Sequence, residues 1–120
     1  MDRLERALAV PAPPALSAAA GSVGCSAAGI HELERRGRIV ELEPDLAYAT
    51  STYGELAERA VAMASVAPLT PAAFRDATGT SRKYVMAILA DLDRRGVLQR
   101  RSDGHVPGPR VGSASAAVRP

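Results

Sequence analysis

The side chains best suited to chemistry in this chain are cations and one tyrosine near its C-terminal end. One group occupies residues 81–84, at the start of a predicted helix, and the other occupies residues 100–105, after that helix. Cations at a helix start suit a phosphate, and a tyrosine ring suits stacking on a base. The candidate contact residues are Ser81, Arg82, Lys83, Tyr84, Arg100, Arg101 and His105. This pattern predicts a nucleic-acid contact, and a merely solvated basic face is the alternative.

Charge is divided unevenly along the chain. Residues 1–73 carry 6 basic and 9 acidic side chains, whereas residues 74–120 carry 9 basic and 4 acidic ones. The formal net charge of +2 therefore conceals an acidic N-terminal part and a basic C-terminal part. We expect only the second part to meet a polyanion.

Several classes of protein are disfavoured by the residues present. The single cysteine, Cys25, cannot form an internal disulfide or a zinc cluster, and His31 and His105 lack metal-ligand spacing. No phosphate-binding loop, G-x-S-x-G elbow or H-E-x-x-H motif occurs. No apolar run is long enough to span a bilayer. We therefore expect a cytoplasmic monomer that is not an enzyme and needs no cofactor or metal.

The elements that position the candidate residues read as a helix, a helix–turn–helix and a β-hairpin. Apolar side chains recur with helical spacing over residues 53–66, 71–78 and 81–95. Thr70 and Pro71 are typical of a helix start, and Gly79 and Gly96 of helix ends. Residues 97–101 and 105–106 then read as two strands around a tight turn. This order predicts a winged helix, in a mainly α fold with small β-hairpin wings (α+β).

An internal repeat predicts two such units in tandem. The proline, glycine and serine at positions 13, 24 and 26 recur 55 residues later, and Leu33–Gly37 recurs as Leu92–Gly96. We predict a degenerate winged-helix domain at 1–50, a winged-helix domain at 51–106 and a disordered tail at 107–120. In the first copy the helix start at residues 25–28 is uncharged and the predicted wing is acidic. That copy should serve as a spacer or as a docking surface for the second.

Three segments of the second unit resemble the C-terminal winged-helix repeats of SelB, the selenocysteine-specific translation elongation factor of bacteria. These segments are Leu69–Asp76, Gly79–Tyr84 and Leu92–Gly96, and the resemblance extends over about residues 55–106. In that family the last winged-helix domain binds an mRNA hairpin of the SECIS type through its recognition-helix start and its wing. The resemblance implies RNA contact at Ser81, Arg82 and Lys83, and further contacts at Arg101 and His105.

The resemblance also implies further partners. The family carries a GTPase and tRNA-binding region, which is not among these residues, so the chain is either a piece of a longer factor or a stand-alone remnant. The ribosome and a GTPase-bearing portion of the same factor are the implied partners besides the mRNA hairpin. Two other functions stay open: a winged-helix DNA-binding transcriptional regulator and a protein-interaction scaffold. The regulator is disfavoured because residues 85–90 offer no polar side chain to a major groove.

Overall fold

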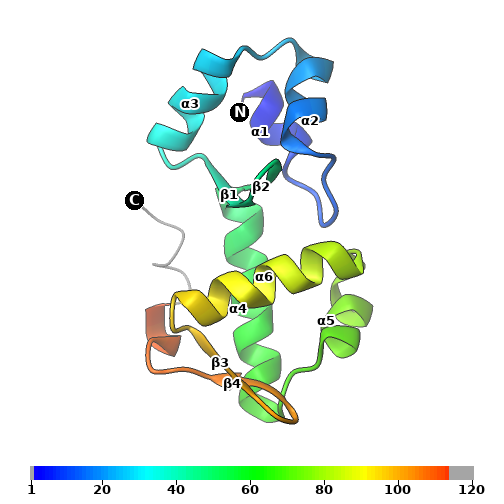
Figure 1. The fold of residues 1–120 in the computed structure, drawn as a ribbon, viewed down its shortest axis with the longest axis vertical. Coiled ribbons are helices and arrows are strands. Elements are labelled where there is room, and N and C mark those ends of the chain that lie inside the picture. The colour runs from blue at the N-terminus through cyan, green and yellow to red at the C-terminus, as the bar shows by residue number, and fades with distance from the viewer. Residues whose placement is uncertain (1, 114–120) are drawn as a thin grey trace.

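The computed structural model describes residues 2–113, and these residues are mainly helical with two small antiparallel hairpins. This is the α+β class predicted from the sequence. The elements are α1 (Arg3–Ala7), α2 (Leu16–Val23), α3 (Ala27–Arg35), β1 (Ile39–Glu43), β2 (Leu46–Ala49), α4 (Thr50–Val66), α5 (Pro71–Thr78), α6 (Arg82–Arg94), β3 (Leu98–Arg101), β4 (Gly104–Pro107) and the 3₁₀ helix η1 (Val111–Ser113). Figure 1 shows α1–α3 at one end of the molecule and α5, α6 and β3–β4 at the other. Helix α4 starts below the β1–β2 hairpin and passes behind α6 in this view.

The helix–turn–helix forms where the local signals predict it. The Thr70 hydroxyl accepts a hydrogen bond from the backbone N–H of Ala73, and Pro71 follows in the first turn of α5. Gly79 ends α5 with a φ of 75°, a left-handed conformation that glycine adopts readily. The turn then leads directly into α6.

The hairpin after α6 is completed by the segment that precedes α5. Strands β3 and β4 pair antiparallel, from Leu98 opposite Pro107 to Arg101 opposite Gly104. The backbone of Leu69 adds a bridge to the free edge of β4, with two hydrogen bonds to His105 of 2.8 and 2.9 Å. The wing is thereby fixed to the body of the domain.

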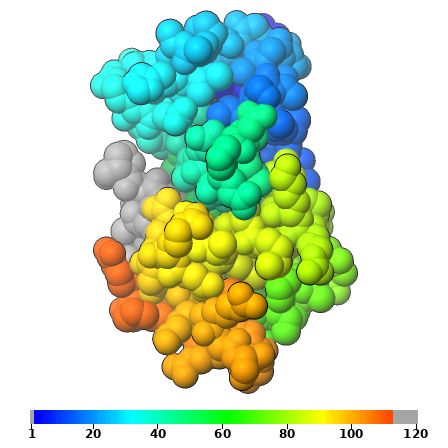
Figure 2. Space-filling view, viewed as in Figure 1, coloured from blue at the N-terminus to red at the C-terminus, as the bar shows by residue number. Residues whose placement is uncertain are grey.

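The larger core is shared between the two halves of the chain. Val85, Ile88, Leu89 and Leu92 form the predicted apolar stripe of α6, and each is at most 1% exposed. The same cluster of buried side chains contains Leu42, Leu46 and Tyr48 from the first hairpin. On the face drawn in Figure 2 the two halves touch, with the β1–β2 hairpin lying over α6. The β1–β2 hairpin therefore covers part of the core that surrounds α6.

The smaller core holds the N-terminal elements together. It consists of buried side chains from α1, α2, β1 and β2: Leu4, Leu8, Leu16, Ala19, Ala20, Ile39, Ala47 and Ala49. Ile30 and Leu33 of α3 pack against this core but are only partly buried, and α3 has no buried residue. Helix α2 starts at Leu16 without a side-chain capping hydrogen bond, and both the backbone N–H and the hydroxyl of Ser17 donate to the Asp45 carboxylate.

The structure departs from the predicted boundaries most at the start of α4 and after the wing. Helix α4 begins at Thr50, three residues before the predicted start, and the Thr50 hydroxyl donates to the backbone oxygen of Gly37. Residues 107–113, assigned to a disordered tail, are ordered: the N–H of Gly108 donates to Val97 O and that of Arg110 to Gly96 O. These bonds fold the segment back over the turn between α6 and β3. The rest of the predicted tail, 114–120, lies outside the described residues.

Gly104 provides a test of how the wing is attached. Its φ is 140°, and an added Cβ would lie 2.9 Å from the backbone oxygen of Leu69. We expect Gly104→Ala to lower the free energy of unfolding by about 1–3 kcal/mol, because the bridge to Leu69 must open to relieve the contact. Urea unfolding measures this loss. Gly21→Ala is the control, since a Cβ there meets nothing within 4 Å; equal stability of the two variants would contradict the prediction.

Candidate nucleic-acid interface

The start of α6 presents the first group of candidate residues. Ser81, Arg82 and Lys83 are all exposed. Ser81 occupies the N-cap position, and its side chain makes no capping hydrogen bond. The first-turn N–H groups and two cations are thus presented together, which is the arrangement that favours an anion.

Arg75 joins this surface, although it was not among the contact residues predicted from the sequence. Arg75, on α5, and Arg82 line the same small hollow of about 30 Å³. Both side chains belong to exposed residues, and Arg75 also lies 3.7 Å from a carboxylate oxygen of Asp76. A signal was present in the sequence, since Arg75 lies within the segment Leu69–Asp76 that carries the resemblance.

The first hairpin brings an acidic group near Lys83. Asp45 lies in the turn between β1 and β2. Hydrogen bonds from the Ser17 hydroxyl and backbone N–H lower the pKa of Asp45, and the positive charge of Lys83 lowers it further. The exposed cation of Lys83 is therefore close enough to the N-terminal half to act on one of its carboxylates.

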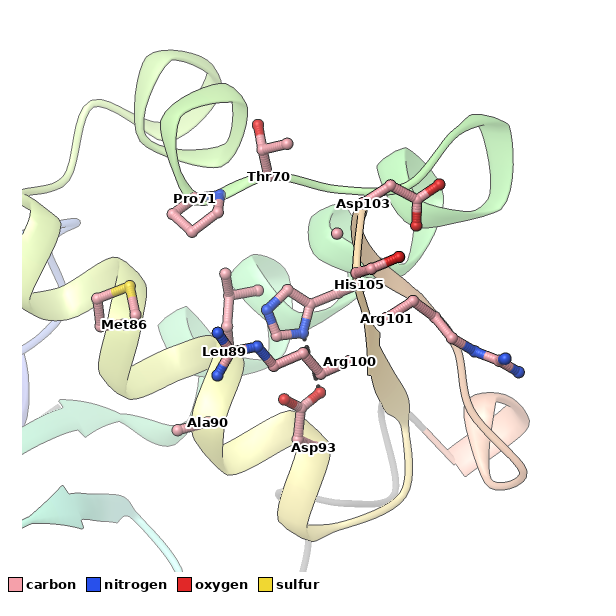
Figure 3. Close-up of a pocket in the computed structure, with 12 residues that line it drawn as sticks. Thr70, Pro71, Met86, Leu89, Ala90, Asp93, Arg100, Arg101, Asp103 and His105 are labelled. Carbon is pink, nitrogen blue, oxygen red and sulfur yellow. Dashed lines mark hydrogen bonds and ion pairs between the residues drawn. The ribbon is translucent and has the colours of Figure 1, made fainter.

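The wing presents the second group of candidate residues. Arg100 and Arg101 are both exposed and lie on β3. Figure 3 shows the Arg100 side chain extending across a hollow towards Leu89, whereas Arg101 points away from it. The hollow lies between α6 and the wing and has a volume of about 270 Å³. Its apolar lining includes Pro71, Met86, Leu89 and Ala90.

His105 does not lie on the exposed face of the wing. It is only 7% exposed, and its Nδ1 is 3.0 Å from a carboxylate oxygen of Asp93, as the dashed line in Figure 3 marks. Its backbone pairs with Leu69. In this structure His105 fastens the wing to α6 and to Leu69, and it also lines the hollow between α6 and the wing. Whether it contacts RNA stays a prediction.

Tyr84 faces the N-terminal half of the molecule. Its hydroxyl donates a hydrogen bond to the backbone oxygen of Pro13, and its ring packs edge-on against Tyr48 with centroids 5.8 Å apart. Burial raises the pKa of the Tyr84 hydroxyl. Tyr84 is half-buried, and the N-terminal half of the chain supplies the surface against which its ring packs. Stacking of this ring on a base stays a prediction.

The arginines at the end of α6 support the fold. Asp91 is 6% exposed and accepts hydrogen bonds from Tyr53, Arg94 and Arg95. Burial is the main reason that the pKa of Tyr53 is raised, and the charge of Asp91 raises it further. Arg94 and Arg95 therefore neutralise a buried carboxylate.

Metal sites and membrane-spanning helices are two further features that residues 2–113 could contain. Within that range, no group of three or more His, Cys, Asp or Glu side chains could hold a metal ion. In the same part of the chain, no helix is both long and apolar enough to cross a membrane.

The arrangement of α4, α5, α6 and the β3–β4 wing defines a winged-helix protein with an exposed cationic helix start. Residues 62–106 match the family model described as elongation factor SelB, winged helix. The resemblance noted in the sequence is thus confirmed over the segment that contains α5, α6 and the wing. A comparison with curated proteins finds no match.

A solved structure shares this fold. It is described as the structure of the mRNA-binding domain of elongation factor SelB from E. coli in complex with SECIS RNA. The similarity has a TM-score of 0.67 at 24% sequence identity, and it covers 77% of this chain and 80% of that chain. The likeness extends beyond the segment matched by the family model, so it includes part of the N-terminal half.

Proposed function

We propose that this chain binds an mRNA hairpin of the SECIS type, as the RNA-binding region of a selenocysteine-specific elongation factor. The observation that carries the proposal is the family match over residues 62–106, because that segment contains all the candidate contact residues. The similar E. coli structure is described as a complex with SECIS RNA, which supports the same partner.

The RNA surface runs from the start of α6 to the wing. Ser81, Arg82 and Lys83 meet phosphates at the helix start, with Arg75 beside them, and Arg100 and Arg101 meet the backbone at the wing. The hollow of about 270 Å³ lies between the two groups, and its apolar floor suits the face of an unpaired loop base. Phosphate contacts supply affinity and loop bases supply specificity.

The exposed side of α6 argues against a DNA-reading role. After Tyr84, the exposed or half-exposed positions on the helix are Met86, Ala90, Asp93 and Arg94. Met86 and Ala90 offer no hydrogen bond to a base edge, and Asp93 is bonded to His105. This helix therefore offers few side chains that could recognise base edges in the major groove of DNA.

The remaining parts of the proposal follow from a binding role. The chain acts without a cofactor or metal and catalyses no reaction itself. It works in the cytoplasm as a monomer, and it meets the ribosome or a GTPase-bearing portion of the same factor. Residues 1–50 form a degenerate winged-helix unit and residues 51–106 form the RNA-binding unit.

A titration against two nucleic acids tests the proposal. A SECIS-type RNA hairpin and a duplex DNA of similar length are each titrated at 50 and 200 mM salt. We expect the hairpin to bind more tightly at both concentrations, with a loss of about a hundredfold between them if four phosphates are neutralised. Equal and equally salt-sensitive binding would indicate a generic basic surface. Failure to bind either would leave the scaffold function.

A further inference from the structure

The two residues that flank Ser81–Lys83 are hydrogen-bonded to the N-terminal half of the chain. The Thr80 hydroxyl donates to the backbone oxygen of Pro11 at 2.6 Å, and the Tyr84 hydroxyl donates to that of Pro13. Pro11 and Pro13 belong to residues 11–14, which connect α1 to α2 and are called the proline link here. The first turn of α6 is therefore held on both sides by one short segment.

The proline link is itself firmly held. The Tyr48 hydroxyl also donates to the oxygen of Pro11, at 2.7 Å, and the Pro13 side chain is less than 2% exposed. Tyr48 packs against Tyr84 on one side and against Tyr53 on the other, with centroids 5.8 and 6.2 Å apart. Proline rings fix φ, so the carbonyls that accept these bonds belong to a stiff segment.

The three residues between Thr80 and Tyr84 have exposed side chains. Ser81 makes no capping bond, and Arg82 and Lys83 are exposed side chains with long flexible stems. Binding that orders such side chains costs conformational entropy, and a backbone fixed in advance lowers that cost. The hydrogen bonds of Thr80 and Tyr84, one on each side of the cations, can fix the backbone of the α6 start before RNA binds.

We propose that Thr80 and Tyr84 are positioning residues, which use the proline link to hold Arg82 and Lys83 where they meet RNA. The inference rests on the proposed function. It gives the N-terminal half a part in RNA binding, although the corresponding helix start of that half carries no charge. The N-terminal half thus contributes to the binding surface by holding the α6 start in place.

Removal of one hydroxyl at a time tests the proposal in the full chain. Tyr84→Phe keeps the ring on Tyr48 and deletes the bond to Pro13, and Thr80→Val deletes the bond to Pro11 with little change of shape. We expect each variant to bind the RNA hairpin about fivefold more weakly. Circular dichroism melting of the same samples records any change in folding.

Tyr53→Phe is the matched control, since it also deletes a buried tyrosine hydroxyl that contacts α6. That hydroxyl bonds to Asp91, in the C-terminal half of the helix. We expect Tyr53→Phe to lower the melting temperature more than Tyr84→Phe does and to leave RNA affinity within about twofold of the parent. If the variants weakened binding only by destabilising the fold, Tyr53→Phe would weaken it most. That result would overturn the proposal.

A double-mutant cycle separates positioning from a direct contact. With Arg82→Ala and Lys83→Ala already present, Tyr84→Phe should cost no further affinity, whereas in an Arg100→Ala background its cost should persist. The proposal would be overturned if Tyr84→Phe lowered the RNA affinity as much in the chain that lacks the two cations as it does in the parent. The proposal would also be overturned if Tyr84→Phe left the RNA affinity unchanged while Tyr84→Leu lowered it. Those two results together would indicate that the ring stacks on a base. If the parent chain binds no hairpin, the proposed function fails and takes this inference with it.

Discussion

Lys83→Glu will weaken binding of the RNA hairpin by about a hundredfold and leave the melting temperature nearly unchanged. Charge-assisted hydrogen bonds contribute roughly 1.5–3 kcal/mol, and the reversal replaces attraction with repulsion at the same phosphate. Lys83 is exposed and forms no part of either core, so its replacement should alter stability by less than about 0.5 kcal/mol. The measurements are an RNA titration at fixed salt and a thermal melt.

Arg3→Glu is the control for net charge. Arg3 is exposed on α1, in the N-terminal half, and its reversal changes the charge of the chain by the same amount. We expect this variant to bind within a fewfold of the parent, since charges beyond about 10 Å are largely screened at 0.1 M salt. Equal losses in the two variants would mean that only overall charge matters, and the α6 start would leave the proposed surface.

The helix–turn–helix and wing could be predicted from the sequence because their signals are local. Thr70 and Pro71 begin α5, Gly79 ends it, and the apolar stripe of α6 lies within 13 residues. Gly104 ends the tight turn of the wing with a φ that glycine tolerates. Each of these features depends on residues only a few positions away in the sequence. The spacing of residue types was therefore sufficient to predict these elements.

The candidate site was harder to predict because part of it depends on distant residues. Tyr84 bonds to a residue 71 positions away, and no local pattern shows that the first unit will cover its ring. His105 pairs with Asp93 across the α6–wing contact, which removes it from the exposed surface. Ser81, Arg82, Lys83, Arg100 and Arg101 are all exposed, as expected, but whether they bind RNA stays a prediction.

A chain that begins at Ser51 will fold with a free energy of unfolding lower by roughly 3–6 kcal/mol, and it will bind the hairpin more weakly. The truncation removes Leu42, Leu46 and Tyr48, each at most 7% exposed, from the core that surrounds α6. Burial of a side chain of this size contributes about 1.5–3 kcal/mol, and less when the unfolded chain is compact. Chemical unfolding and RNA titration of the fragment measure the two losses.

A second fragment, beginning at Ile39, separates the loss of the β1–β2 side chains from the loss of the proline link. It restores the β1–β2 hairpin and its three core side chains but still lacks the proline link, so we expect most of the stability to return. Thr80 and Tyr84 would still lack Pro11 and Pro13, and RNA affinity should therefore stay below that of the full chain. Recovery of affinity together with stability would show that the hairpin alone orders the α6 start. A fragment from Ser51 as stable as the full chain would show that the shared core contributes nothing.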